Sequence, residues 1–329
     1  MNRQQPDRNL ALDLVRVTEA AALSSARWLG RGRKEEGDQA AVDAMRLSFN
    51  ALEIDGVVVI GEGEKDQAPM LYNGERLGSG RGPKMDVAVD PVEGTNLLAL
   101  GRPNAIAVAA LAPRGSMYDP GPAFYMKKLA VPRQARGCAD LAAPTAEILR
   151  RVAAALCKDV DDLTVFVLEK PRHRELIREI REAGARIQLH TDGDVAGALM
   201  AAMPGSGIDL MMGTGGVPEG ILAAAAVRVM GGEIQCRLDP QSATEHESVV
   251  RAGLDLNRIL FTEDLIGSED VFFAATGISG GGFLGGVEFN GTGARTVSIV
   301  LRGRTGTIRR IESDHAFDKL MRFSAIRYD

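Results

Sequence analysis

The sequence predicts an α/β protein with two closely packed lobes, and three observations support this prediction. The chain has 329 residues, whereas a typical domain has roughly 150. Hydrophobic patterns of helical period alternate with short apolar runs of the strand type along most of the chain. No low-complexity linker separates the two halves. The rhythm of the pattern changes near Ala139, so we place the lobes at residues 1–139 and 140–329.

The first lobe is predicted to contain two helices followed by strands. Apolar residues recur at helical spacing between Leu10 and Trp28, which predicts a helix that ends before Gly30. A second helix is predicted over residues 38–52. Short runs of apolar and β-branched residues then predict strands at residues 57–60, 85–90, 104–111 and 124–131. The first lobe is therefore expected to pair helices with a sheet.

The second lobe is predicted to alternate helices with strands and to end in further strands. Helices are expected at residues 144–156, 175–184, 195–203 and 218–230. Strands are expected at residues 163–169, 185–190, 208–213, 270–277, 283–289, 294–303 and 305–312. Alternation of this kind indicates a layered α/β lobe.

Composition narrows the possible partners of the protein. The net charge is −5, with 39 basic and 44 acidic residues, which argues against a basic surface for nucleic acid. No run reaches the roughly 18 apolar residues of a membrane span, and the first ten residues are polar, unlike a signal peptide. Cys138, Cys157 and Cys236 form no CxxC pair and are expected to be buried and reduced. We therefore predict a cytoplasmic protein that binds neither nucleic acid nor membrane.

The stretch VDPVEGTN places two carboxylates at the end of a predicted strand. Pro91 fixes φ and lacks an N–H, which favours a turn after Asp90 over a continuing strand. Across such a turn, Asp90 and Glu93 can converge with the carbonyl of Val92. Oxygen ligands of this kind suit hard cations such as Mg²⁺ or Mn²⁺. For an isolated motif, a solvated acidic turn is the alternative.

Other acids occupy comparable positions along the chain. Glu62 follows the apolar run 57–60, Glu219 opens a helix after the glycine-rich turn GTGGV, and Asp38 begins a predicted helix. Each of them alone could be a helix cap or a surface acid. Taken together, they are carboxylates at strand ends and helix starts, where the sites of α/β proteins collect.

In order along the chain, the motifs GEGE, DPVEGT, KPRH, DGD and PEG resemble the lithium-sensitive, magnesium-dependent phosphatases, and most closely the class II fructose-1,6-bisphosphatases of bacteria. The resemblance covers nearly the whole chain. It implies a layered αβαβα sugar-phosphatase fold and hydrolysis of the 1-phosphate of fructose 1,6-bisphosphate to fructose 6-phosphate and phosphate, a gluconeogenic reaction. It also implies a site with two or more Mg²⁺ or Mn²⁺ ions. Because metal-bound water can attack a phosphoryl group without a protein nucleophile, we expect direct in-line attack and no phosphoenzyme.

The resemblance also assigns the metal site. The implied ligands are Asp38, Glu62, Asp90, Glu93 and Glu219. Thr95, Asp38 and Glu62 are the implied catalytic residues, with the Thr95 hydroxyl relaying a proton toward Asp38. A turn or N-cap hydroxyl is the structural alternative for Thr95. The nearby acids with a supporting or structural role are Glu64, Asp66 and Asp86.

Substrate recognition is assigned mainly to the second lobe. Lys170, Pro171 and Arg172 follow a predicted strand and would hold the distal phosphate; a solvated basic loop is the alternative. His173 could assist, although a capping or surface role is equally open. The remaining implied contacts are the turn Asp192, Gly193 and Asp194 toward sugar hydroxyls, Tyr125 and Gly216, and Glu93, Gly94 and Thr95 beside the metal ions.

Three other functions remain open at this point. A bifunctional fructose-1,6-/sedoheptulose-1,7-bisphosphatase would use the same motifs. An inositol or nucleotide phosphatase is disfavoured, because a monophosphate leaves no need for the KPRH and DGD segments. A silent phosphosugar-binding regulator is disfavoured by the complete set of acids. A homodimer or homotetramer is expected from the resemblance alone.

Overall fold

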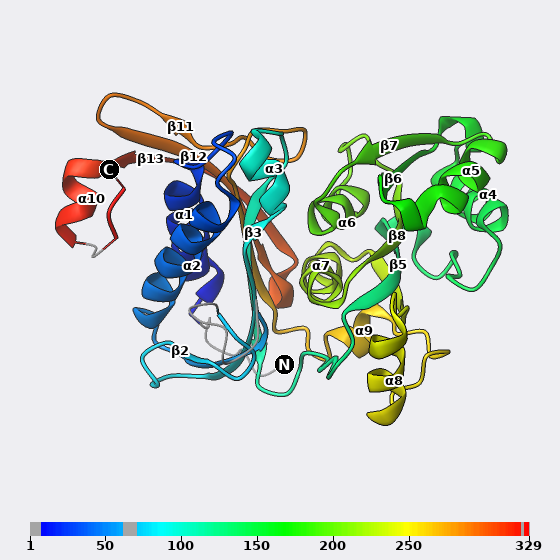
Figure 1. The fold of residues 1–329 in the computed structure, drawn as a ribbon, viewed down its shortest axis with the longest axis horizontal. Helices are drawn as coiled ribbons and strands as arrows, with labels where there is room; N and C mark the ends of the chain where they lie inside the picture. The colour runs from blue at the N-terminus through cyan, green and yellow to red at the C-terminus, as the bar shows by residue number, and fades with distance from the viewer. Residues whose placement is uncertain (1–7, 62–70, 324–325, 329) are drawn as a thin grey trace, which may run out of the picture.

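The computed structural model describes residues 8–61, 71–323 and 326–328. This part of the chain is a mixed α/β structure with two sheets (Figure 1), which confirms the predicted class. Its helices are α1 Leu10–Ala26, α2 Lys34–Asn50, α3 Thr95–Leu100, α4 Thr145–Leu156, α5 Arg174–Glu182, α6 Asp194–Ala202, α7 Val217–Met230, α8 Ala243–Arg251, α9 Thr262–Leu265 and α10 Phe317–Phe323.

The strands of the described chain form one sheet of eight and one of five. The first has the order β11-β12-β10-β4-β3-β1-β2, with β13 on the other side of β12, and the second has the order β7-β6-β8-β5-β9. Their bounds are β1 Asp55–Ile60, β2 Arg76–Leu77, β3 Lys84–Glu93, β4 Ile106–Pro113, β5 Tyr125–Val131, β6 Thr164–Leu168, β7 Arg186–His190, β8 Leu210–Gly216, β9 Glu233–Leu238, β10 Phe272–Gly277, β11 Glu288–Phe289, β12 Gly293–Arg302 and β13 Thr307–Ala316.

Helices cover the faces of both sheets (Figure 1). Helix α1 packs on β4, β10 and β12 of the first sheet, with α2 beside it. Helices α6 and α7 lie between the sheets, where α7 contacts both β3 and β5. Because protein surrounds α7, it needs no polar face, and its run Ala223–Ala226 is entirely buried.

Strand β6 shows why the second sheet is covered on both faces. Successive side chains of a strand point to opposite faces. Phe166 and Leu168 belong to the core between the two sheets, whereas Val165 and Val167 belong to the core beneath α4 and α5. All four are buried. The run of the strand is apolar throughout because its side chains fill a separate core on each face of the sheet.

Several predicted bounds differ from the structure. Helix α2 begins at Lys34, so Asp38 lies in its second turn and does not open the helix. Only Glu288–Phe289 of the predicted strand 283–289 is a strand. The preceding residues fold back on the segment after β10 instead, where a Cβ on Gly286 would lie 2.3 Å from the nitrogen of Gly280. The elements that were not predicted are the strands β2 and β9 and the helices α3, α8, α9 and α10.

The three cysteines are not equivalent. Cys236 is buried, but Cys138 and Cys157 are exposed, so the prediction of three buried thiols was wrong for two of them. The two exposed residues lie on either side of α4, one in the segment before the helix and one directly after it.

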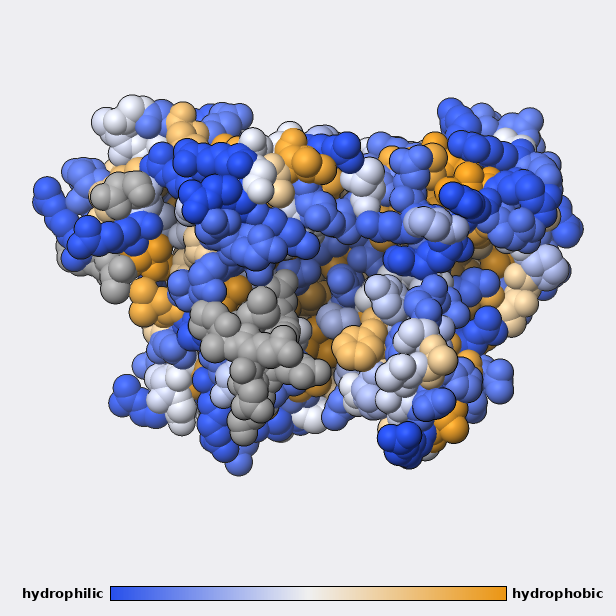
Figure 2. Space-filling view, viewed as in Figure 1, coloured by the Kyte–Doolittle hydropathy of each residue, from blue (hydrophilic) through white to orange (hydrophobic). Residues whose placement is uncertain are grey.

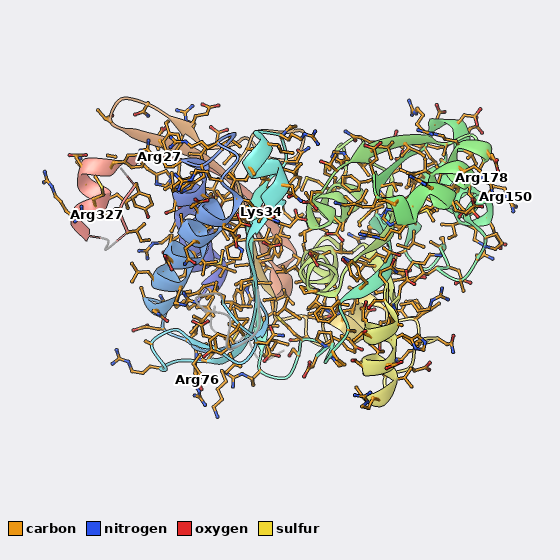
Figure 3. The ribbon with its side chains drawn as sticks, in the orientation of Figure 1. Arg27, Lys34, Arg76, Arg150, Arg178 and Arg327 are labelled. Atoms are coloured by element: carbon orange, nitrogen blue, oxygen red, sulfur yellow. The ribbon has the colours of Figure 1, made fainter. Side chains whose placement is uncertain are left out.

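The visible surface is mostly hydrophilic, with hydrophobic side chains in scattered places (Figure 2). Of the labelled basic side chains, Arg150 and Arg178 lie toward the right end of the view, Arg76 lies at its lower edge and Lys34 lies near the middle beside α3 (Figure 3). In the described part of the chain, every helix is too short or too polar to span a bilayer.

Candidate active site

A β-bulge in β3 brings Asp90 and Glu93 onto one face of the first sheet. The strand continues through Pro91 to Glu93, so the prediction that it ends at Asp90 was wrong. Asp90 pairs with Val108 of β4 and Glu93 with Ile106, which leaves one extra residue in β3. Residues three apart in a regular strand face opposite ways, and the extra residue corrects this. The bulge also accommodates a proline, which has no N–H for the ladder.

The shared face of these two acids is directed toward α6 and α7. Cross-strand partners lie on the same face of a sheet. The partners Val108 and Ile106 belong to the core that α6 and α7 fill between the sheets. Asp90 and Glu93 therefore point into the space between the two sheets and away from α1 and α2.

Thr95 is the first residue of α3, and the residue before it caps the helix. Gly94 has a φ of 89°, in the left-handed region that favours glycine. Its carbonyl accepts from the backbone N–H groups of Leu97 and Leu98. A hydroxyl at position 95 is thus not the N-cap, and Thr95 lies half-buried immediately after Glu93 and the turn.

The start of α6 contacts Glu93 directly. Gly193 is the left-handed residue before the helix, with a φ of 96°. The backbone N–H of Val195 donates to Oε1 of Glu93 at 3.2 Å, across 102 residues of chain. An N–H in the first turn of a helix is a good donor to a carboxylate. The contact joins the DPVEGT and DGD segments in one site.

Glu219 enters the same site from α7. Strand β8 ends at Gly216, and Glu219 lies in the first turn of the helix that follows. A Cβ on Gly216 would lie 1.9 Å from Oε2 of Glu219. A side chain at position 216 would therefore displace this carboxylate, which explains the glycine at this point.

The electrostatics indicate a crowded group of acids. Burial raises the pKa of Glu93 well above its usual range, and neighbouring negative charges raise it further, namely those of Asp194, Asp192 and Glu219. Burial also raises the pKa of Glu219, as does the charge of Asp194, whereas Lys128 lowers it. Oε2 of Glu93 and Oε2 of Glu219 are buried and accept no hydrogen bond from the described residues. Buried, under-coordinated carboxylate oxygens fit a hard cation.

The structure describes only part of the predicted ligand set. Within residues 8–61, 71–323 and 326–328, no group of three or more His, Cys, Asp or Glu side chains has an arrangement that could hold a metal ion. Glu62, with Glu64 and Asp66, lies outside these residues. Asp86 does not belong to the site, because its Oδ2 accepts from the N–H groups of Ser116 and Met117.

Asp38 reaches the region of α3 through the packing of α2. It follows Gly37, where a Cβ would lie 2.7 Å from Cδ2 of Leu98. The close approach of the two helices at Gly37 places the second turn of α2 beside the helix that Thr95 opens. Oδ1 of Asp90 accepts from the N–H of Val92 at 3.1 Å within the bulge.

Arg172 and Tyr125 meet at the carboxyl edge of the second sheet. Tyr125 is the first residue of β5 and pairs with Gly216. The guanidinium of Arg172 lies 5.1 Å from the centre of the Tyr125 ring, and its Nε donates to the carbonyl of Thr214 at 2.9 Å. These two contacts set the plane of the guanidinium.

Lys170 lies beside the DGD turn. Its Nζ is 3.9 Å from Oδ1 of Asp192, while Oδ2 of Asp192 accepts from Nδ2 of Asn96 at 3.1 Å. Asp192 therefore connects the KPRH segment with α3. Asn96 was not predicted as a site residue, since an exposed asparagine after a turn has no distinguishing pattern.

His173 is buried between β6 and β8. Its Nδ1 lies 2.7 Å from the carbonyl of Leu168, and its Nε2 accepts from the N–H of Thr214 at 2.7 Å. Burial lowers its pKa, so the ring is neutral and donates from Nδ1. His173 therefore braces the loop that carries Arg172. It occupies the N-cap position of α5, as the capping alternative expected, although its side chain makes no cap hydrogen bond. The surface alternative was wrong, because the residue is buried.

Lys128 is a buried cation that the sequence analysis missed. It is 1% exposed, and its Nζ lies 2.5 Å from Oδ2 of Asp194. Burial lowers the pKa of Lys128, but the charges of Asp194 and Glu219 outweigh burial and leave the pKa above its usual value. The signal was available, because successive side chains of a strand point to opposite faces, so two adjacent lysines in the strand FYMKKLAV cannot both lie on a solvent-facing side.

Comparison with known proteins identifies the family. The model of the bacterial, glpX-encoded fructose-1,6-bisphosphatase family matches residues 8–315. The chain belongs to this family. A class 2 fructose-1,6-bisphosphatase of Haemophilus influenzae is 44% identical over 327 residues, covering 95% of this chain and 98% of the relative. Fructose-1,6-bisphosphatase 1 class 2 of Escherichia coli K12 is 44% identical over 325 residues, covering 95% and 96%. The predicted class II resemblance is confirmed.

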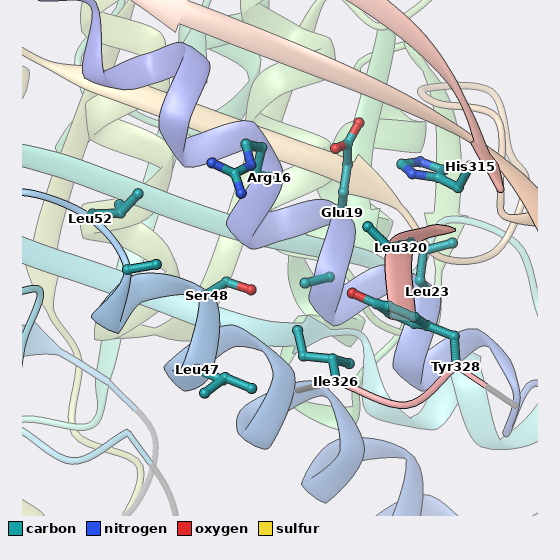
Figure 4. Close-up of a pocket in the computed structure, with 12 residues that line it drawn as sticks. Arg16, Glu19, Leu23, Leu47, Ser48, Leu52, His315, Leu320, Ile326 and Tyr328 are labelled. Atoms are coloured by element: carbon teal, nitrogen blue, oxygen red, sulfur yellow. The ribbon is translucent and has the colours of Figure 1, made fainter. Parts of the chain in front are cut away.

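This member of the glpX-type family also has a cavity that lies away from the carboxylates of the candidate active site. It has a volume of about 340 Å³ and lies between α1, α2 and the C-terminal segment (Figure 4). Its lining includes Leu23, Leu47 and Tyr328. Because α1 and α2 cover the opposite face of the first sheet from Glu93, this cavity is not part of the candidate active site.

Proposed function

We propose that this chain hydrolyses the 1-phosphate of fructose 1,6-bisphosphate, giving fructose 6-phosphate and phosphate in gluconeogenesis. The observation that supports this most directly is the meeting of Glu93 with the start of α6 and with the charge of Glu219. It joins three of the motifs on which the family resemblance depends. The relatives at 44% identity are named as fructose-1,6-bisphosphatases of class 2.

In this proposal the acids hold two or more Mg²⁺ or Mn²⁺ ions. The ligands would be Asp38, Glu62, Asp90, Glu93 and Glu219. The buried Oε2 atoms of Glu93 and Glu219 fit this role, because they lie among further negative charges. Bound divalent ions would lower the pKa of water and neutralise phosphoryl oxygens.

The chain itself would position the reacting groups. Thr95 begins α3 next to Glu93, and its Oγ1 would pass a proton toward the carboxylate of Asp38, with Glu62 assisting. Gly94 carries no side chain, so the backbone at the turn can approach a phosphoryl group closely. Phosphoryl transfer depends chiefly on such positioning and on charge stabilisation.

The second sheet would bind the rest of the substrate. Arg172 is oriented by Thr214 and Tyr125, which leaves the outer N–H groups of its guanidinium for the distal phosphate, with Lys170 and Pro171 alongside. The acids of the turn Asp192–Gly193–Asp194 would accept hydrogen bonds from sugar hydroxyls. Gly216 would contact the substrate through its backbone.

The arrangement of the sheets and helices supports a proposal for the fold. The proposed fold is the layered αβαβα sugar-phosphatase fold with two lobes, and it is supported by the positions of α1 and α2 on one face of the first sheet and of α7 between the two sheets. The lobes are proposed at residues 1–139 and 140–329. Some strands belong to the sheet of the other lobe: β5 lies in the second sheet, and β10 to β13 lie in the first. A cytoplasmic homodimer or homotetramer is proposed from the family resemblance.

A substrate panel tests the function. Purified protein with Mg²⁺ or Mn²⁺ is offered fructose 1,6-bisphosphate, sedoheptulose 1,7-bisphosphate, inositol 1-phosphate and adenosine 3′,5′-bisphosphate, and released phosphate is measured. We expect release from the first substrate. Comparable release from the second would indicate the bifunctional enzyme, and preference for the last two would contradict the proposal. No release from any of them would favour a silent binder.

Arg172→Lys is expected to raise KM for fructose 1,6-bisphosphate by about tenfold and to change kcat by less than about threefold. A lysine cannot keep both the contact with Thr214 and a bidentate grip on phosphate. Steady-state kinetics measure the effect. Arg178→Lys is the matched control, since Arg178 pairs with Glu175 and Glu182 on the exposed face of α5. An unchanged KM in Arg172→Lys would exclude Arg172 from phosphate binding.

A further inference from the structure

We propose that Lys128 is a positioning residue for substrate binding, which acts by holding the carboxylate of Asp194. This inference rests on the proposed function. The ammonium lies 2.5 Å from Oδ2 of Asp194, and the side chains of Lys128 and Asp194 are 1% and 6% exposed. Because Lys128 is bonded to Oδ2, it fixes the orientation of the Asp194 carboxylate that would accept a sugar hydroxyl.

The surroundings of the pair are fitted to a charged group. Burying an ammonium costs several kcal/mol unless a partner compensates for the lost hydration. A Cβ on Gly215 would lie 2.0 Å from Oδ2 of Asp194 and 3.2 Å from Nζ of Lys128. A Cβ on Gly220 would lie 3.2 Å from Cε of Lys128. Gly215 therefore makes room for the charged ends of this pair, and Gly220 leaves space for Met126 and the stem of Lys128.

The pair is connected to the reacting end of the site. Asp194 is the first residue of α6, and the next residue, Val195, donates to Oε1 of Glu93. The charge of Lys128 acts on Asp194 and also on Glu219. Lys128 thus fixes the first turn of α6 against β5 while that turn contacts Glu93. Its own Nζ is directed to Asp194, so it acts through that carboxylate.

A purely structural ion pair is the competing explanation, and a double-mutant cycle separates the two. The variants are Lys128→Met, Asp194→Asn and the double variant, each assayed at saturating Mg²⁺ for KM and kcat on fructose 1,6-bisphosphate. Thermal unfolding reports whether each one folds. Lys158→Met is the matched control, because Lys158 pairs with Asp209 at the same 2.5 Å but is 40% exposed.

We expect Lys128→Met to raise KM about tenfold with kcat changed by less than about threefold, and Lys158→Met to change neither. In the Asp194→Asn background, Lys128→Met should add less than about a twofold change in KM, since the two residues act as a unit. The double variant removes both charges of the pair, so its KM can still be compared with that of Asp194→Asn if Lys128→Met does not fold. An unchanged KM in Lys128→Met, or an additive effect in the double variant, would overturn the inference. Failure of wild-type protein to hydrolyse the substrate would instead overturn the proposed function.

Discussion

Glu219→Gln is expected to lower kcat on fructose 1,6-bisphosphate by about a thousandfold, while the protein remains folded. Glutamine has nearly the same shape and can occupy the space above Gly216, where a Cβ would otherwise lie 1.9 Å from Oε2. It cannot supply the negative charge that a divalent cation requires. The loss should therefore appear in turnover and not in the melting temperature. Steady-state kinetics at several Mg²⁺ concentrations measure it.

Glu233→Gln is the matched control for this loss. Glu233 is also a buried glutamate of the second sheet, but its carboxylate is occupied by Gln235 and the N–H of Gly137. We expect its activity to stay within about threefold of wild type. If Glu219→Gln retained activity at the level of Glu233→Gln, the carboxylate of Glu219 would have no part in catalysis.

The positions of the acids at element ends could be predicted from the sequence, but their convergence could not. Pro91 correctly marked an irregularity in the strand, yet the pattern did not distinguish a turn from a bulge. A bulge is defined by the partner strand, and only the pairing of Asp90 with Val108 and Glu93 with Ile106 reveals it. The bulge decides that both carboxylates share a face. Local sequence contains no information on that register.

Contacts between distant segments were beyond sequence patterns for the same reason. The motif DGD was recognised, but the donation from Val195 to Glu93 depends on how α6 docks between the sheets. Helix α8 was missed although its signal was local. Ser242 accepts from the N–H of Glu245, and this S-x-x-E pattern marks the start of a helix. Buried Lys128 was missed because composition treats lysine as a surface residue.

Glu93→Gln is expected to stabilise the metal-free protein at neutral pH by roughly 1–3 kcal/mol. Burial and neighbouring negative charges raise the pKa of Glu93 well above its usual value of 4.5. A carboxyl with a raised pKa in the folded state costs stability above its unfolded pKa, because the unfolded state releases the proton more readily. Glutamine removes this cost and keeps an oxygen that can accept from Val195. Thermal unfolding in EDTA measures the gain, and added Mg²⁺ should stabilise wild type more than the variant.

Two features separate this explanation from improved packing. Glu245→Gln should have the opposite sign, since the buried carboxylate of Glu245 accepts from the N–H groups of Phe124, Tyr125 and Gln241. The gain from Glu93→Gln should also depend on pH: it should grow as the pH rises above about 4.5, the usual value for a glutamate, and be absent below it. A gain of equal size on both sides of that pH would have to come from packing. In that case the charge of Glu93 would impose no cost on the fold, and its raised pKa would not be a source of instability in the metal-free protein.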